Sequence, residues 1–248
     1  MIVIKSKREI DLMREPCKVT GEILRDLRDY IKPGMSTQDI NAYVEDRIAH
    51  YKMKPTFKGY GGFPAGACVS VNEEVIHGIP AKDRILEEGD IVSVDTGATF
   101  HGYNSDAART YAVGEISDDN KKLIEVTEQS FYEGIKYAME GFKIHDIGHA
   151  VQAYAEKNGM GVIRDYTGHG TGSQLHEDPQ IPNYGKPGTG ARIVPGMTLA
   201  IEPMLSLGTY NVRVLSNDWT VVTLDGKASA HYENTILVTD GEPEILTL

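Results

Sequence analysis

The chain has 248 residues, of which 40% are hydrophobic and 25% are charged, and its formal net charge at pH 7 is −11. These values are typical of a globular protein, and the length accommodates one large α/β domain. The negative charge argues against broad affinity for nucleic acid, and no apolar run approaches the roughly 20 residues that a membrane-spanning helix needs.

The cysteines and the first residues indicate the compartment. Cys17 and Cys68 are the only cysteines and lie far apart in the sequence, so they do not form a disulfide framework. Charged residues begin at Lys5, which is too early for the apolar core of a signal peptide. We therefore expect a cytoplasmic protein without membrane attachment.

Two capped helices are predicted in the first part of the chain. Ser6 and Glu9 have the spacing of a capping box ahead of a segment with helical apolar periodicity, and Pro16 within it predicts a kink. A second helix is expected at 36–51, where Ser36 is followed by an acidic residue three positions later. A glycine- and aromatic-rich loop is then expected at 57–66, and strands at 67–71, 91–95 and 107–113.

The second part of the chain repeats this order of helices followed by strands. Apolar periodicity predicts a helix at 118–139 and another that begins near His145. Strands are predicted at 197–206, 211–215, 219–224 and 229–239. Because no low-complexity linker divides the chain, we expect one α/β (α+β) domain over residues 1–248.

An internal repeat relates the two parts of the chain at an offset of 107 residues. It aligns Gly34 with Gly141, Asp39 with Asp146, Ile40 with Ile147, Val44 with Val151, Met53 with Met160, Gly89 with Gly196, Val94 with Ile201, and Asp95 with Glu202. A register shared by helices and strands predicts two similar halves, approximately 1–115 and 116–248, related by a pseudo-twofold axis. Asp95 and Glu202 would then face each other at the junction, where ligand sites often form.

Five polar residues interrupt segments that otherwise have the character of apolar strands or glycine-rich turns. They are Asp95, Asp106, His169, Glu202 and Glu233. A carboxylate on a buried strand costs several kcal/mol unless its charge is compensated, and few basic residues lie near these positions in the sequence. Any one of them alone would more commonly be a surface or turn acid, but the set of five predicts a cation site.

The residue types indicate which cations fit. Four carboxylates and one imidazole suit Mn, Fe(II), Co or Zn rather than a thiolate zinc site. Two such ions about 3.5–4 Å apart can share bridging carboxylates and lower the pKa of a bound water from about 15.7 towards 7. We therefore predict a pair of divalent metal ions that makes hydroxide available at neutral pH.

A second histidine pattern is rejected as a metal site. The run from His145 to His149 nearly matches the H-E-x-x-H zinc motif, but it has the shorter Asp146 in place of the glutamate. The internal repeat retains the acid as Asp39 and has neither histidine, which is typical of a residue at the start of a helix.

The order and context of the five residues resemble a known family. The segments Asp95-x10-Asp106, Thr167-Gly168-His169-Gly170, Ile201-Glu202-Pro203 and Tyr232-Glu233-Asn234-Thr235 resemble those of type I methionine aminopeptidases over essentially the whole chain. The resemblance implies the pita-bread (creatinase/aminopeptidase-like) fold, with two pseudo-twofold-related halves around a central antiparallel-rich sheet. It also implies the short bacterial form of the family.

The resemblance implies a ligand set and a reaction. Asp95 and Asp106 would hold one metal, while Asp106, His169, Glu202 and Glu233 would hold the other, which we expect to fill first. The implied reaction is removal of the initiator methionine from nascent proteins and peptides when the second residue is small, by attack of metal-activated hydroxide on the first peptide bond.

Further residues receive roles from the same resemblance. His176 would donate a hydrogen bond to the scissile carbonyl or the developing oxyanion, His77 would contact the substrate near the scissile nitrogen, and Glu202 would also accept a proton from the metal-bound water. The substrate pocket would be lined by Tyr60, Phe63, Cys68, His77 and Trp219, with His176 also binding substrate. Phe57 and Leu175 replace a cysteine and an aromatic residue found in some relatives, and a monovalent cation is implied near Asn72 and Ser229.

Other functions remain open from the sequence. A prolidase or aminopeptidase P shares the implied fold but normally carries a large additional N-terminal domain. A non-catalytic binding module of this fold would lose metal ligands, whereas all five are present here. We expect a monomer that acts on nascent polypeptides with N-terminal Met, and Lys52, Lys54 and Lys58 leave open either a transient ribosome contact or a merely solvated surface.

Overall fold

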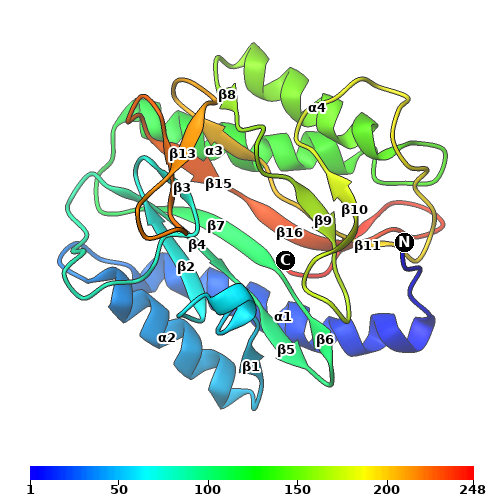
Figure 1. Cartoon of the computed structure of the whole chain (residues 1–248), viewed down its shortest axis with the longest axis horizontal. Helices are drawn as coiled ribbons and strands as arrows, with labels where there is room; N and C mark the ends of the chain where they lie inside the picture. Colours follow the sequence, from blue (N-terminus) through cyan, green and yellow to red (C-terminus); the bar gives the residue numbers. More distant parts are fainter.

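The computed structural model describes residues 1–248, which form one large β-sheet, three small sheets and four α-helices (Figure 1). The helices are α1 (Lys7–Tyr30), α2 (Thr37–His50), α3 (Asp118–Ile135) and α4 (Ile144–Lys157), with one 3-10 turn, η1 (Tyr60–Gly62). None of these helices combines the length and the hydrophobicity that a bilayer crossing requires.

The large sheet has eight strands, and all its pairings are antiparallel. Its strands are β2 (Ala67–Val71), β4 (Ile91–Thr96), β7 (Ala107–Ala112), β9 (Gly168–Gly170), β10 (Glu177–Ile181), β11 (Thr198–Ile201), β16 (Glu233–Leu237) and β17 (Glu244–Ile245). They follow the order β10-β9-β11-β16-β7-β4-β2, with β17 paired to β16. The strands β7 and β16, one from each half, therefore meet at the centre.

Nine shorter strands form three small sheets around the large one. They are β1 (Lys54–Pro55), β3 (Glu74–Ile76), β5 (Ala98–Phe100), β6 (Tyr103–Asn104), β8 (Gly161–Val162), β12 (Met204–Ser206), β13 (Val212–Val214), β14 (Val221–Thr223) and β15 (Ser229–His231). Two of the three sheets join distant parts of the chain: β3 pairs with β14, and β8 pairs with β12.

The 107-residue repeat predicted from the sequence is present in the backbone. Both ends of α4 lie 107 positions after the matching ends of α2. The isolated bridge between Ser36 and Ile85 has its counterpart between Lys143 and Arg192 at the same offset. In the large sheet, β4 and β11 occupy equivalent places on either side of the central β7–β16 pair. The predicted fold class is therefore confirmed, while the division into halves near residue 115 stays a prediction.

Each helix pair packs on the strands of its own half (Figure 1). The largest apolar cluster, of 19 buried residues, joins α1 and α2 to β2, β4 and β7. A second cluster, of 13 buried residues, joins α3 and α4 to β10, β11 and β16. These two apolar clusters fix the positions of the strands against the helices. They therefore also fix the positions of the polar residues that the strands carry.

The helix starts agree with the sequence, and one helix end does not. Ser6 and Glu9 form the predicted capping box, and α1 continues as one helix through Pro16. The helix predicted to reach residue 139 ends at Ile135, because the chain then tightens into turns in which Tyr137 donates to the carbonyl of Gly134.

The two long strands predicted near the C-terminal end are each broken. The first divides into β11 and β12 around Glu202 and Pro203, and the second divides into β15 and β16 around Tyr232. Pro203 has no amide hydrogen to donate to a ladder, and its carbonyl accepts a hydrogen bond from the Tyr232 amide at 3.1 Å. The two breaks therefore lie opposite each other, beside Glu202 and Glu233.

Candidate active site

The five polar residues predicted as metal ligands come from five consecutive strands of the large sheet. His169 lies in β9, Glu202 directly follows β11, Glu233 begins β16, Asp106 directly precedes β7, and Asp95 lies in β4. These residues are widely separated in the sequence, and only the antiparallel order of the strands brings them together. Each half contributes to the cluster, which lies across the central β7–β16 contact.

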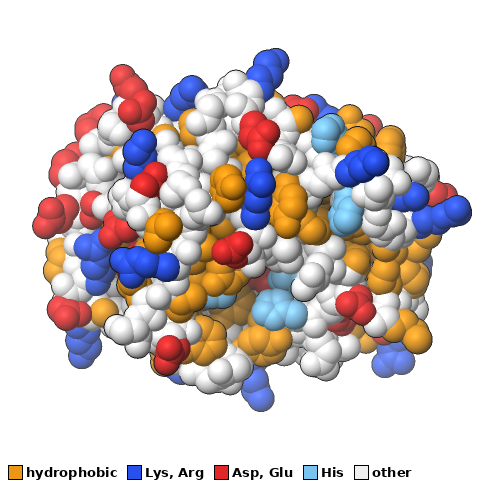
Figure 2. Space-filling model, turned by 45° about the horizontal axis from the view of Figure 1, so that its top comes forward, with side chains coloured by type: hydrophobic (Ala, Val, Ile, Leu, Met, Phe, Trp, Pro, Cys, Tyr) orange, Lys and Arg blue, Asp and Glu red, His pale blue; other side chains and the backbone are white.

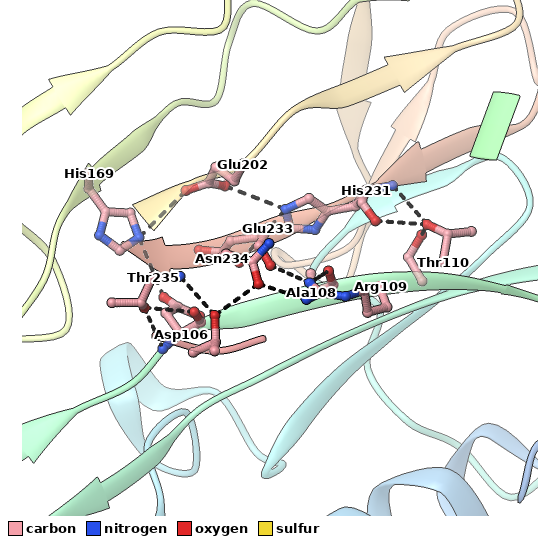
Figure 3. A network of polar contacts seen from close by, with 12 residues as sticks. Asp106, Ala108, Arg109, Thr110, His169, Glu202, His231, Glu233, Asn234 and Thr235 are labelled. Carbon is pink, nitrogen blue, oxygen red and sulfur yellow. Dashed lines mark hydrogen bonds and ion pairs between the residues drawn. The ribbon is translucent and has the colours of Figure 1, made fainter. Parts of the chain in front are cut away.

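The side chains converge in overlapping groups. Asp95, Asp106 and Glu233 form one group, and His169, Glu202 and Glu233 form another, with possible ligand atoms within 4.8 Å of one another in each group. The Nε2 atom of His169 is 3.5 Å from Asp106 Oδ2 and 3.5 Å from Glu202 Oε1 (Figure 3). Glu233 belongs to both groups, which is the place that a bridging carboxylate would occupy.

Burial shifts the pKa of each of these groups in the direction that favours its neutral form. It raises the pKa of Asp95, Glu202 and Glu233 well above the usual range, and the negative charge of Asp106 adds to the effect. Burial lowers the pKa of His169 to about 4. The protein alone therefore does not provide a favourable environment for four carboxylate charges.

Several carboxylate oxygens of the cluster have no hydrogen-bond partner in the protein, as is expected of atoms that bind a metal ion. Asp95 Oδ1, Asp106 Oδ1 and Glu233 Oε1 are buried without a hydrogen-bond partner. Arg109 lies close by, but its guanidinium donates to backbone carbonyls and to Asn234 rather than to these carboxylates (Figure 3). Unpaired buried carboxylate oxygens next to an imidazole nitrogen fit one or two divalent cations.

The hydrogen bonding of His169 supports the same interpretation. Its Nδ1 atom lies 2.9 Å from the carbonyl oxygen of Gly170, which can only accept, so Nδ1 carries the hydrogen. The Nε2 lone pair is then directed at the carboxylates. A backbone carbonyl that fixes the tautomer in this way is a common feature of metal-binding histidines.

A cavity of about 900 Å³ opens onto the cluster, and the five residues all line it. The six residues predicted to bind substrate line the same cavity: Tyr60, Phe63, Cys68, His77, His176 and Trp219. Figure 2 shows a hollow on the molecular surface where histidine and hydrophobic side chains gather. The structure thus brings together every residue that the sequence assigned to the site.

One end of the cavity is apolar. Phe57, Phe63, Cys68 and Leu175 pack in one buried cluster, and Trp219 covers it with its ring at 5.1 Å from that of Phe63. Cys68 is paired with Asp95 across β2 and β4, so the apolar end adjoins the carboxylates. A flexible apolar side chain therefore fits beside the candidate metal centre.

Two further histidines, His77 and His176, line the cavity. His176 is exposed to the cavity, and its Nδ1 atom lies 2.9 Å from the Tyr60 hydroxyl. His77 has a φ of 59°, a backbone conformation that is uncommon for residues other than glycine. Burial lowers the pKa of both imidazoles to about 4, so both are neutral at pH 7.

Sequence reasoning missed two residues beside the site. His231 is 2% exposed and lies 3.8 Å from Glu202 and 3.9 Å from Glu233. Its position two residues before Glu233 was the available signal, because alternate residues of an extended chain share a face. Lys5 forms a buried ion pair with Glu177, the residue after His176. The two residues are 172 positions apart in the sequence, so no local pattern indicates that they pair.

The rejected zinc pattern is remote from the cavity. Asp146 caps α4 by accepting from the Lys143 amide, His145 pairs with Thr189, and His149 is exposed.

Near the predicted monovalent cation position, the Ser229 amide donates to the Asn72 carbonyl at 2.8 Å. That cation stays a prediction.

A comparison with known protein families matches residues 11–240 to the model of metallopeptidase family M24. The chain belongs to this family. Among curated M24 relatives, a methionine aminopeptidase of Clostridium acetobutylicum is 56% identical over 248 residues, which cover 100% of this chain and 99% of that protein.

Solved structures agree with this membership. The crystal structure of methionine aminopeptidase from Thermotoga maritima is 49% identical with a TM-score of 0.98, and the match covers 100% of this chain and 99% of that chain. A prolidase from Pyrococcus furiosus is 22% identical with a TM-score of 0.81, covering 99% of this chain and 65% of that chain. The prolidase shares the fold alone, whereas the full-length relatives confirm the resemblance stated from the sequence.

Proposed function

We propose that this M24 protein removes the N-terminal methionine from peptides and nascent proteins whose second residue is small. One observation carries the proposal: a single cavity joins the five clustered polar residues, two facing histidines and an apolar end. The full-length likeness to methionine aminopeptidases supports it.

We propose that Asp95, Asp106 and Glu233 hold one divalent ion, and that Asp106, Glu233, His169 and Glu202 hold the other. This assignment is supported by the two groups that share Glu233 and by the unpartnered carboxylate oxygens. Ions of this kind supply Lewis acidity and lower the pKa of water. The mixed oxygen and nitrogen donors suit Mn, Fe(II), Co or Zn.

The side chains around the cluster would divide the remaining work of peptide hydrolysis. Glu202 would accept a proton at one carboxylate oxygen, since burial raises its pKa and so favours the protonated form. His176 would donate from Nε2 to the substrate carbonyl, because the Tyr60 hydroxyl can satisfy Nδ1. His77 would contact the substrate near the scissile nitrogen.

The apolar end would bind the methionine side chain. Tyr60, Phe63, Cys68, His77 and Trp219 line this region, and aromatic edges and a thiol suit a polarizable thioether. A flexible side chain packed there would place its own first peptide bond beside the carboxylates. Steric exclusion would then set the preference for a small second residue.

We propose a role on nascent chains in the cytoplasm, which the proposed substrate supports. We propose that the protein acts as a monomer, and that any contact with the ribosome is made through Lys52, Lys54 and Lys58, which follow α2. Lys58 already pairs with Glu45 at 2.5 Å, which leaves less free charge for RNA there.

Metal analysis combined with peptide turnover tests the function. The metal-loaded protein should release methionine from Met-Ala-Ser and should leave Met-Leu-Ser and Ala-Pro-Ser largely intact. Failure to cleave Met-Ala-Ser under anaerobic conditions with Mn, Fe(II) or Co would refute the proposal. Cleavage of Ala-Pro-Ser instead would indicate an aminopeptidase P activity, which has the same fold.

A further inference from the structure

The imidazole of His231 is buried behind the carboxylate cluster and has no assigned role. The residue ends β15, is 2% exposed, and does not line the cavity. Its Nε2 atom has no hydrogen-bond partner in the protein. An unpaired polar nitrogen in the interior costs about 1–3 kcal/mol, so its retention there calls for a function.

The ring is directed at the two glutamates. Nε2 lies 3.8 Å from Glu202 Oε2 and 3.9 Å from Glu233 Oε2, and Figure 3 shows the ring beside both side chains. Carboxylates only accept hydrogen bonds, so a matching imidazole carries its hydrogen on Nε2. A movement of about 1 Å brings either oxygen within hydrogen-bond distance.

Glu202 is held between two imidazoles that face different oxygens. Its Oε1 atom is 3.5 Å from His169 Nε2, while its Oε2 atom faces His231. Since His169 Nδ1 is engaged by the Gly170 carbonyl, the His169 Nε2 lone pair and Glu202 Oε1 can bind one cation together. The His231 contact therefore selects which oxygen of Glu202 is presented to that cation.

The backbone of His231 is fixed independently of the carboxylates. Its amide donates to Thr110 Oγ1 at 2.9 Å, and Thr110 Oγ1 lies 2.9 Å from its carbonyl oxygen. His231 also pairs with Met204 between β15 and β12. The backbone of His231 is thus held by β7 and β12 without a bound metal.

We propose that His231 is a positioning residue whose Nε2–H orients Glu202 and Glu233 for the divalent ion that they share with His169. The proposal rests on the metal centre of the proposed function. His231 acts through the two carboxylates and does not touch the substrate, since it lies outside the cavity lining.

Metal affinity, rather than turnover, is the decisive measurement. The Co²⁺-loaded protein is challenged with increasing concentrations of a chromophoric chelator, which gives the Kd of the tighter ion, and its visible absorption spectrum is recorded. His231→Leu, which removes the N–H, should weaken this Kd by about 10–100-fold, the usual effect of losing a partner of a metal ligand. His231→Gln, whose amide can place an N–H near the former Nε2, should recover most of the affinity.

The control is His149→Leu, which replaces an exposed histidine on α4 and should leave the Kd and spectrum unchanged. Unchanged affinity in His231→Leu, or equal losses in His231→Leu and His231→Gln, would overturn the proposal, because the N–H would then not matter. If His231→Leu does not fold, Thr110→Val, which weakens the support of the ring, should reduce affinity in the same direction, and an unchanged Kd would overturn it. A wild-type protein that binds Co²⁺ but fails to cleave Met-Ala-Ser would refute the function while leaving this comparison valid.

Discussion

Replacing Lys5 with methionine should destabilise the protein strongly, although the residue lies outside any helix or strand. The side chains of Lys5 and Glu177 are only 2% and 6% exposed, and Nζ lies 2.5 Å from Oε2. The other carboxylate oxygen accepts from the Gln174 amide at 3.1 Å. Glu177 therefore closes the turn that carries His176, and Lys5 neutralises it.

The magnitude follows from the burial of both partners. Methionine retains the length of the Lys5 stem, which packs on Gly172, so the main loss is the positive charge. Leaving one partner of a buried ion pair unpaired costs about 3–5 kcal/mol. For a chain of 248 residues this corresponds to a fall of roughly 6–20 °C in the melting temperature.

Urea unfolding of the metal-saturated protein measures the loss. Lys18→Met is a matched control, since Lys18 is in an exposed pair with Glu22 and should lose less than about 1 kcal/mol. The double variant Lys5→Met/Glu177→Gln should recover much of the stability, because no unpaired charge remains buried. A loss for Lys5→Met no larger than that of Lys18→Met, or a double variant as unstable as the sum of the singles, would refute the reasoning.

Three further predictions concern the site. Gly78→Ala should cost about 1–3 kcal/mol and lower kcat as His77 shifts, because the added Cβ would lie 2.2 Å from the Val69 carbonyl oxygen; wild-type stability in thermal unfolding would contradict this. His176→Ala should retain its metal in elemental analysis but lose about 10²–10³ in kcat, and loss of metal would instead make His176 a ligand. Chelation should lower the melting temperature, because the folded state then loses the ions that its buried carboxylates bind, and added Co²⁺ or Mn²⁺ should restore it; a melting temperature unaffected by chelation would show that the cluster does not hold a metal that stabilises the fold.

The site could be predicted from sequence as far as each residue contrasts with its immediate neighbours. Asp95 stands out because it ends a buried apolar run, and Glu202 because it does the same in the second half. His231 does not stand out in this way. Its role depends on the distance to Glu202, which only the pairing of β12 with β15 determines.

The fold could be predicted to the level of its elements and its internal repeat, but not to the ends of elements. The helix starts were predictable because caps are local, as Ser36 and Asp39 show. The break between β11 and β12 was not placed, although Pro203 marks it, because a proline at the edge of a sheet need not end a strand. At that break the Pro203 carbonyl accepts a hydrogen bond from the Tyr232 amide, a contact between distant segments that no local pattern indicates.

Departures from the internal repeat explain why we expect the two metal positions to differ. Asp95 and Glu202 occupy equivalent places around the central strand pair, so the halves alone would provide two similar positions. His169 and His231 both lie next to Glu202, whereas Asp95 is grouped only with Asp106 and Glu233. A nitrogen donor and an oriented carboxylate favour a transition metal more than oxygen donors alone do. We therefore expect tighter metal binding at the Glu202 position than at the Asp95 position.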